Sequence, residues 1–411
     1  MDDGESSICR HLRRTFHQGH VGLMFNRPSK HGIHDSPGAD EDPQRAWLAF
    51  REYGPLVWTP RNGGHWVATS GPDVAAMFRD NHRFSSASVT IPSVPADRLL
   101  PLEADPPLHA DYRRAIMSYL TPVRVKALEP EIRALAGELI DAIAPRGQCE
   151  FIGDFAHHLP LIIVLRLLDL PLSDRAYLHA RTEIFARHPD LQAKIDAYLE
   201  VRSYLELRIA ERQAAPGDDL ISHLLRARVD GRPFTPQELL STCTMVTFAG
   251  LDTVAAMFGF VALFLARSPA QRRFILETPG QRPLVVSELL RRYATSNMGR
   301  VLAEDVVHGN VTMKRGDHIM LSPSLYNLDP ALFSEPERVD FDRSPRHITF
   351  GTGSHTCAGA QLARMEIQIF IEEWLARIPD FAVSTTERIA ARAGPVNTLD
   401  QLPLVWRPEI N

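Results

Sequence analysis

The chain has 411 residues, of which 44% are apolar and 23% are charged, and these values exclude a long disordered or fibrous protein. It carries 45 Lys and Arg against 50 Asp and Glu, and the formal charge of −5 argues against non-specific binding to nucleic acid phosphates. The cysteines Cys9, Cys149, Cys243 and Cys357 are far apart and include no Cys-x-x-Cys pair, so we expect neither a disulfide framework nor a structural zinc site.

The first segment, residues 1–45, is polar and rich in His and Arg, which predicts a loosely ordered arm. It contains no apolar signal segment, so we expect a cytoplasmic protein. After the arm, Leu56–Thr59 and His65–Thr69 flank the turn Asn62-Gly63-Gly64, a pattern typical of a β-hairpin.

The region from about 105 to 290 has a helical pattern, and its most distinctive part begins at a capping box, Thr235-Pro236-Gln237-Glu238. Nothing breaks the pattern before Ser268, which predicts one helix of about 30 residues, or 45 Å. The helix is apolar or small on every face, so it should run through the middle of the molecule. Asp252 is its only charge from 239 to 266, too costly to bury without a partner. Because Gly250 lacks a Cβ, a bulky group could press on the backbone there.

The last third returns to extended structure over Asp305–Leu321, with turns at 308–310 and 314–317, followed by one helix from about 358 to 377 and short strands near the C-terminus. The two most apolar stretches, 159–172 and 239–266, both contain charged residues and fall short of the roughly 20 uncharged residues of a membrane span. The sequence therefore predicts a mainly α-helical protein with a small β region and no membrane contact.

The sharpest motif is the stretch from Phe350 to Gly359, which places Cys357 at the end of a glycine-rich loop and at the start of a helix. Glycines permit unusual backbone dihedrals, and a helix N-terminus stabilises an anion, so this setting favours a thiolate that acts as a metal ligand or a nucleophile. An inert buried cysteine is the weaker alternative, because the glycines, the aromatic residue and the cation of the motif are all in place.

This stretch resembles in full the cysteine-ligand loop of the cytochrome P-450 superfamily, the haem-thiolate monooxygenases. The resemblance extends over nearly the whole chain, in the right order, and within the superfamily it is strongest to the bacterial camphor hydroxylase and its relatives. It implies that 46–411 form a single, mostly helical P-450 domain with a small β region. The other segments that carry it are 249–253, 287–292, 327–341, 377–381 and 402–406.

The resemblance implies a haem b cofactor whose iron is bound by Cys357, with Gly359 beside it in the loop. Haem has two propionates, which require cations at its edge. Each cation taken alone is equally well explained as an exposed basic residue, but four in register with the family pattern favour propionate contacts. They are His109, Arg113, Arg300 and His355.

A second implied group is structural. Glu288 and Arg291 lie three apart on one helix face, where an ion pair is most often solvated and worth under about 1 kcal/mol. The resemblance implies instead a buried network of Glu288, Arg291 and Arg338 that supports the cysteine loop.

The resemblance assigns oxygen chemistry to Asp252 and Thr253. Cleaving O2 requires two protons, and a hydroxyl next to a gated carboxylate can deliver them. The relatives pair this Asp with basic residues on a neighbouring helix, where the present chain has Arg187, with His179 in place of a second cation. The alternative is a structural Asp252 satisfied by Arg187 alone.

We therefore predict a monooxygenase that hydroxylates a small apolar substrate. The chain has no flavin or dinucleotide fingerprint, so its electrons should come from NAD(P)H through a reductase and an acidic [2Fe-2S] ferredoxin. We expect the ferredoxin to dock on a basic patch of Arg113, Arg114, Arg343 and Arg346. The rival functions are a haem protein that binds or senses a ligand without turnover and a peroxide-using enzyme, but neither needs the Asp252-Thr253 pair.

The substrate pocket differs from that of the camphor enzyme, in which a tyrosine donates a hydrogen bond to the substrate ketone. Alignment puts Asp97 there, and an ionised Asp has no proton to donate. We therefore expect a compact cyclic terpenoid: a monoterpenoid, with camphor bound weakly and a bicyclic ether such as cineole preferred, or a norisoprenoid. The pocket residues implied are Asp97, Leu99, Met245, Phe248, Ala249, Ser296, Met298 and Val396.

Overall fold

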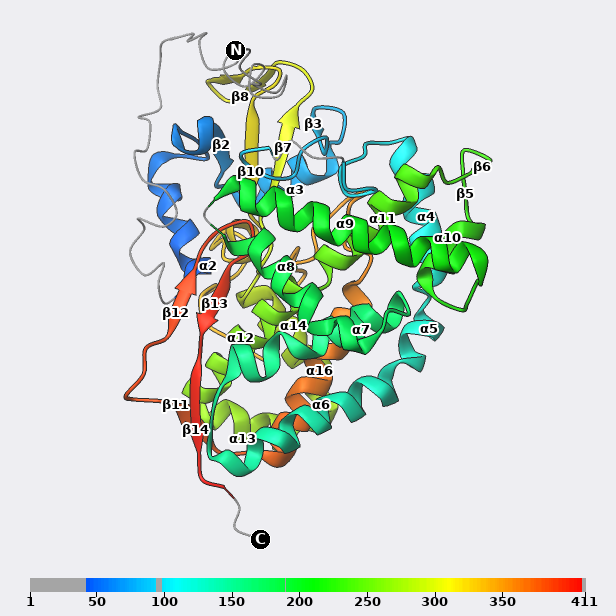
Figure 1. Cartoon of the computed structure of the whole chain (residues 1–411). Coiled ribbons are helices and arrows are strands. Elements are labelled where there is room, and N and C mark those ends of the chain that lie inside the picture. Colours follow the sequence, from blue (N-terminus) through cyan, green and yellow to red (C-terminus); the bar gives the residue numbers. More distant parts are fainter. Residues whose placement is uncertain (1–41, 94–97, 189, 409–411) are drawn as a thin grey trace, which may run out of the picture.

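Figure 1 shows the computed structural model of the chain, which describes residues 42–93, 98–188 and 190–408. Most of the predicted arm lies outside these residues. The last few arm positions already belong to the folded protein, because α2 (Pro43–Ala46) buries Gln44, and Asp42 forms an ion pair with the buried Arg292. Residues 42–45 of the predicted arm are thus part of the described fold.

Helices make up most of the described chain and surround a smaller sheet region, which confirms the predicted fold class (Figure 1). After α2, the helices are η2 (Trp47–Tyr53), η3 (Arg61–Gly63), α3 (Gly71–Arg79), α4 (Leu108–Tyr119), α5 (Pro122–Ala127), α6 (Glu129–Ile143), η4 (Ala144–Arg146), η5 (Ile152–Ala156), α7 (His158–Leu167), η6 (Leu172–Asp174), α8 (Arg175–Arg187), α9 (Leu191–Ala214), α10 (Leu220–Arg226), α11 (Pro236–Ala249), α12 (Asp252–Arg267), α13 (Pro269–Glu277), η7 (Pro279–Gln281), α14 (Arg282–Arg292), α15 (Pro323–Asn327) and α16 (Ala360–Arg377).

The strands form one larger sheet, in the order β1-β2-β10-β7-β3, and several short pairs. The predicted hairpin is confirmed, with Leu56 opposite Ala68, and β10 runs parallel to β2. The predicted extended region is confirmed as β8, β9 and β10. The strands are β1 (Leu56–Thr59), β2 (His65–Ala68), β3 (Phe84–Ser85), β4 (Gln148–Glu150), β5 (Arg228–Val229), β6 (Arg232–Pro233), β7 (Met298–Leu302), β8 (Val306–His308), β9 (Val311–Met313), β10 (His318–Leu321), β11 (Phe381–Val383), β12 (Ala390–Arg392), β13 (Thr398–Gln401) and β14 (Pro403–Trp406).

The apolar interior consists of two clusters. The smaller one lies between the larger sheet and α3, and the larger one gathers side chains of α6, α7, α12 and α16 around Phe258, Phe370 and Trp374. By length and composition, Pro236–Arg267 is the single candidate membrane span among the described residues, and 67% of its most apolar window is buried inside the protein. Burial on nearly every face is what the sequence predicted for a central helix.

The prediction of one continuous helix is wrong in detail, because α11 ends at Ala249 and α12 begins at Asp252. At the break Leu251 has φ −86° and ψ −69°, and the flanking backbone hydrogen bonds are long, 3.4 Å from Gly250 N to Val246 O and 3.3 Å from Ala255 N to Leu251 O. The predicted pressure on Gly250 is present: a Cβ there would lie 2.7 Å from Val164 Cγ2 of α7. The break therefore coincides with a glycine, a poor helix former, and with the close approach of α7 to it.

The contact between Gly250 and Val164 generates a prediction about stability. Gly250→Ala should lower the free energy of unfolding by about 1–3 kcal/mol, because the added methyl overpacks the interface between α7 and α11. In a Val164→Ala background the same substitution should cost much less. Denaturant titration of the four proteins measures the coupling, and an equal penalty in both backgrounds would contradict this account.

Candidate active site

The loop before α16 holds Cys357 in place through its backbone. Gly351 and Gly353 have φ of 72° and 81°, and a Cβ on Gly353 would lie 3.1 Å from Arg79 Cα of α3, so any side chain at Gly353 would be strained. The N–H of Cys357 donates to Phe350 O at 2.8 Å. The position of the sulfur is therefore set by backbone geometry.

Opposing effects act on the pKa of the Cys357 thiol, and the net result is a raised pKa. Burial raises its pKa, while the N–H of Gly359 and the charge of Arg113 act to lower it. The residue has accessible surface although protein surrounds it at longer range, which is the situation of a group that lines an internal space. Because a bound metal cation holds a thiol deprotonated, this sulfur suits a metal ligand better than a free thiol.

Four cationic or imidazole side chains gather near this loop, as the sequence predicted. The rings of His109 and His355 lie 4.1 Å apart, and His355 Nε2 is 3.1 Å from Ser86 Oγ. Burial, together with the charges of His109, Arg300 and Arg113, lowers the pKa of His355 to about 3. His355 is therefore neutral, and the positive charge of the cluster resides on the two arginines.

The cluster lacks anions to balance it. Burial lowers the pKa of Arg300 to about 10, and its Nε is buried without a hydrogen-bond partner. The carboxylate of Asp105, the nearby acid, already accepts hydrogen bonds from Ser85 and from the N–H of Ser86. Arg113 has no carboxylate partner among the described residues. Two carboxylates supplied by a ligand, such as the propionates of haem, fit this arrangement.

The structural network is present, but with a different third member. Glu288 and Arg291 are fully buried and joined by two hydrogen bonds of 2.8 Å, and Arg291 also donates to the carbonyls of Asn327, Pro336 and Arg338. These bonds tie α14 to the segment that leads to the cysteine loop, which supports the predicted role.

The side chain of Arg338 is the part of that prediction that is wrong. It is 62% exposed and pairs with Glu335, because the chain turns outward there, and only its carbonyl joins the network. The second cation near Glu288 is Arg343, 16% exposed, with its Nε 3.3 Å from Glu288 Oε1. Arg343 also donates to Ser334 O, so it does not belong to a free docking patch. No local spacing in the sequence distinguishes Arg343 from Arg338.

At the helix break, Thr253 Oγ1 donates to Ala249 O at 3.1 Å. Asp252 is half-buried and has a polar or electrostatic partner. The side chain of Arg187 lies outside the described residues, and the His179 ring is 5.1 Å from that of His157. The predicted pairing of Asp252 with Arg187 thus stays a prediction.

The predicted pocket residues come from several elements. Asp97 lies outside the described residues. The segment after it is anchored: Leu99 N–H donates to Glu103, Leu100 N–H donates to Ser241 of α11, and Ser241 donates to Arg98 O. Sequence reasoning missed Glu103 and Ser241. Ser241 is one of several hydroxyl residues of α11, so nothing in the sequence singles it out.

Two further aromatic residues were also missed. The Phe248 ring lies 4.5 Å from that of Phe185 in α8 and 6.0 Å from that of Tyr198 in α9, so three helices meet in one aromatic group. Ser296 and Val396 are paired by a β-bridge close to Met298 at the start of β7. Contacts between helices leave no spacing motif, so only the structure reveals the aromatic group. The remaining pocket residues, Met245 and Ala249, lie on α11.

Three features together define the class of haem-thiolate proteins. They are a cysteine in a glycine loop before a long helix, a group of cations without matching anions, and a mainly helical fold with a small sheet. The cytochrome P450 family model matches residues 283–386, which contain both the network and the cysteine loop. The chain is 33% identical over 386 residues to the probable cytochrome P450 127A1 of Sinorhizobium fredii, covering 90% of this chain and 92% of that protein. The chain belongs to the cytochrome P450 family.

The chain is also similar to two other proteins. The crystal structure of cytochrome P450 CYP101C1 matches with a TM-score of 0.86 and 40% identity over 93% of this chain and 98% of that one. The steroid C26-monooxygenase of Mycobacterium tuberculosis is 31% identical over 363 residues, covering 86% and 97%. These relationships confirm the P450 fold, the haem b cofactor and the haem-thiolate monooxygenase activity.

The corrected network generates a prediction that separates the two arginines. Arg343→Met should lower the free energy of unfolding by about 1–3 kcal/mol, because it removes a cation beside the buried Glu288 carboxylate. The matched variant Arg338→Met should change it by under about 0.5 kcal/mol, since its ion pair is exposed. Urea titration of both variants is the measurement, and equal losses would contradict the assignment.

Proposed function

We propose that this monooxygenase hydroxylates a compact, apolar, cyclic molecule, with Cys357 as its iron ligand and with His109, Arg113, Arg300 and His355 around the propionates. The observation that carries the assignment is a buried set of cations that lacks anions, next to a cysteine held by its backbone. Haem b supplies, when bound, the iron at which O2 is activated.

The protein residues that would handle protons lie at the helix break. The backbone hydrogen bonds around Gly250 are long, so the N–H and C=O groups there are weakly paired. A water molecule could therefore bind between α11 and α12. The Thr253 hydroxyl donates to Ala249 O and keeps lone pairs free to accept a hydrogen bond from that water. Asp252, next in the chain, would pass protons from outside to this hydroxyl.

Electrons would reach the site from NAD(P)H through a reductase and an acidic [2Fe-2S] ferredoxin. The aromatic group of Phe185, Tyr198 and Phe248 would form one wall of the substrate pocket. Large rigid rings reduce the space available to a ligand, so we propose a monoterpenoid-sized or norisoprenoid substrate.

The proposed proton path predicts different effects for its two members. Thr253→Ala should consume NADH at a rate within about threefold of the unaltered protein, but its yield of hydroxylated product should fall about tenfold or more, with hydrogen peroxide released instead. Asp252→Asn should slow NADH consumption by about a hundredfold, the usual size of a lost proton-transfer group. Thr253→Ser keeps the hydroxyl and is the control. Parallel assays of NADH, peroxide and product test this, and normal rate and yield in both variants would refute the path.

The substrate proposal predicts a ranking of ligands. Camphor should bind about fivefold or more weakly than cineole, since losing one neutral hydrogen bond costs on the order of 1 kcal/mol. Asp97→Tyr, which adds a donor, should narrow this difference. Titration with camphor, cineole and ionone, followed by the low-spin to high-spin shift, provides the measurement. Tight camphor binding with a full shift in the unaltered protein would overturn the substrate proposal but not the monooxygenase assignment.

A further inference from the structure

A short antiparallel β-bridge joins Ser296 to Val396, two of the residues expected in the substrate pocket. The bridge is flanked by two backbone hydrogen bonds of 2.8 and 2.7 Å, which are donated by the N–H groups of Asn297 and Asn397. This pattern is that of a non-hydrogen-bonded pair, in which facing side chains come closest to each other. The side chains of Ser296 and Val396 therefore lie next to each other.

The two faces of this bridge differ in burial. Ser296, Met298 and Val396 are half-buried. Asn297 is 2% exposed, and Asn397 is fully buried. Because successive side chains of an extended segment point to opposite faces, the asparagines lie on the face away from the other three residues. The half-buried face is the one expected to border the substrate pocket, and the asparagines lie behind it.

The asparagine side chains connect separate segments of the chain. Asn297 Nδ2 donates to Gly394 O at 2.6 Å and to Asn397 Oδ1 at 3.2 Å. Asn397 Nδ2 donates to Ala294 O at 3.3 Å, and the indole N–H of Trp47 donates to Asn397 Oδ1 at 3.2 Å. These bonds cross between the segment before β7 and the segment before β13. They therefore hold the two sides of the bridge in a fixed position relative to each other.

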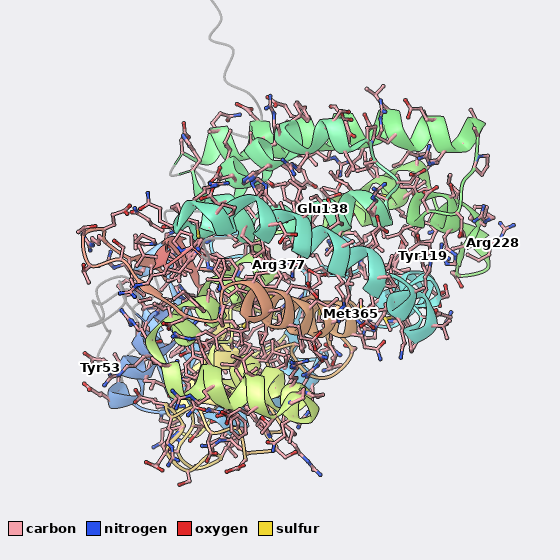
Figure 2. The ribbon with its side chains drawn as sticks, turned by 90° about the horizontal axis from the view of Figure 1, so that it is seen from below. Tyr53, Tyr119, Glu138, Arg228, Met365 and Arg377 are labelled. Carbon is pink, nitrogen blue, oxygen red and sulfur yellow. The ribbon has the colours of Figure 1, made fainter. Side chains whose placement is uncertain are left out.

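Trp47 orients this network from a distant part of the chain. It is 4% exposed and begins η2, whose end at Tyr53 lies at the edge of the molecule in Figure 2. An indole N–H can only donate, so the Asn397 atom that faces it is the oxygen. The Asn297 atom that approaches the same oxygen must then be the amide nitrogen. One donor thus sets the orientation of both asparagine side chains.

We propose that the network of Trp47, Asn297 and Asn397 positions Ser296 and Val396 and thereby sets the shape of one side of the substrate pocket. The three residues act through the backbone of the bridge, so they are positioning residues. Hydrogen bonds require a direction as well as a distance, and a buried network therefore restricts a pocket wall more narrowly than apolar packing does. The inference rests on the proposed function, in which the bridge residues line the pocket.

Two haem ligands of different size measure the shape of the pocket in the haem-loaded protein. Imidazole binds iron through nitrogen and fills little space, whereas phenylimidazole, with its phenyl group on a ring carbon, adds a ring that must fit against the pocket walls. Each Kd is obtained from the shift of the Soret band. The ratio of the phenylimidazole Kd to the imidazole Kd reports on the walls, because binding to iron is common to both ligands.

Two variants alter the network. Trp47→Phe removes the indole donor and keeps an aromatic ring, and it should raise the Kd ratio about threefold. Asn297→Ala removes two donated hydrogen bonds and should raise the ratio about tenfold. The imidazole Kd should stay within about twofold in both variants, because the iron ligand is not altered. An unchanged ratio in Trp47→Phe would overturn the positioning role even where Asn297→Ala does not fold.

Trp406→Phe is the matched control. It also removes one indole donor, whose acceptor is Ala144 O at 2.8 Å, but Trp406 packs against the larger apolar cluster. Trp47→Phe and Trp406→Phe should lower the urea midpoint of unfolding to a similar extent, whereas only Trp47→Phe should change the Kd ratio. An equal change of the ratio in both variants would mean that it follows general stability, and this result would contradict the proposal.

Val396→Ala separates this inference from the proposed function, because it alters a bridge residue directly. It should change the Kd ratio about threefold or more, since it removes two methyl groups from the pocket wall. An unchanged ratio would refute the placement of Val396 in the pocket, and with it the positioning role. A changed ratio in Val396→Ala together with unchanged ratios in the network variants would overturn the role of the network alone.

Discussion

The proposed site depends on holding the Cys357 sulfur inside the protein as an anion. Burial alone would keep the Cys357 thiol protonated, and the N–H of Gly359 and the charge of Arg113 offset only part of that cost. In the proposed function, ligation to the haem iron would complete the stabilisation, but only for a sulfur that cannot move. The glycine loop is pressed against the backbone of α3, and behind it Arg291 binds three carbonyls of the preceding segment. The contacts that stabilise this part of the fold therefore also fix the position of the proposed iron ligand.

One helix links the charged parts of the molecule. On α4, His109 and Arg113 face the cluster that includes Arg300 and His355, and Arg113 also acts on the sulfur. The following residue, Arg114, is exposed and pairs with Asp111. Because neighbouring residues on a helix point about 100° apart, one turn of α4 carries both a cation of the internal cluster and a surface ion pair.

The helix break shows how packing and function combine. Every residue from Pro236 to Arg267 is compatible with a continuous helix, and the capping box at Thr235 forms as expected. The break occurs where Val164 approaches Gly250 and where the Thr253 hydroxyl takes the carbonyl of Ala249. Two backbone hydrogen bonds at this point are long, 3.4 and 3.3 Å, and they lie beside the residues proposed to move protons.

The sequence by itself determined the features whose signals lie within a few residues: the hairpin, the capped central helix, the cysteine loop with its glycines, and through the resemblance the family, the cofactor and the Glu288–Arg291 pair. Only the tertiary structure decided that Arg343 rather than Arg338 lies beside Glu288, and that Phe185 and Tyr198 meet Phe248. The reason is physical. Local dihedral and capping preferences act along the chain, whereas the partner of a charge or an aromatic ring depends on which distant segments pack together.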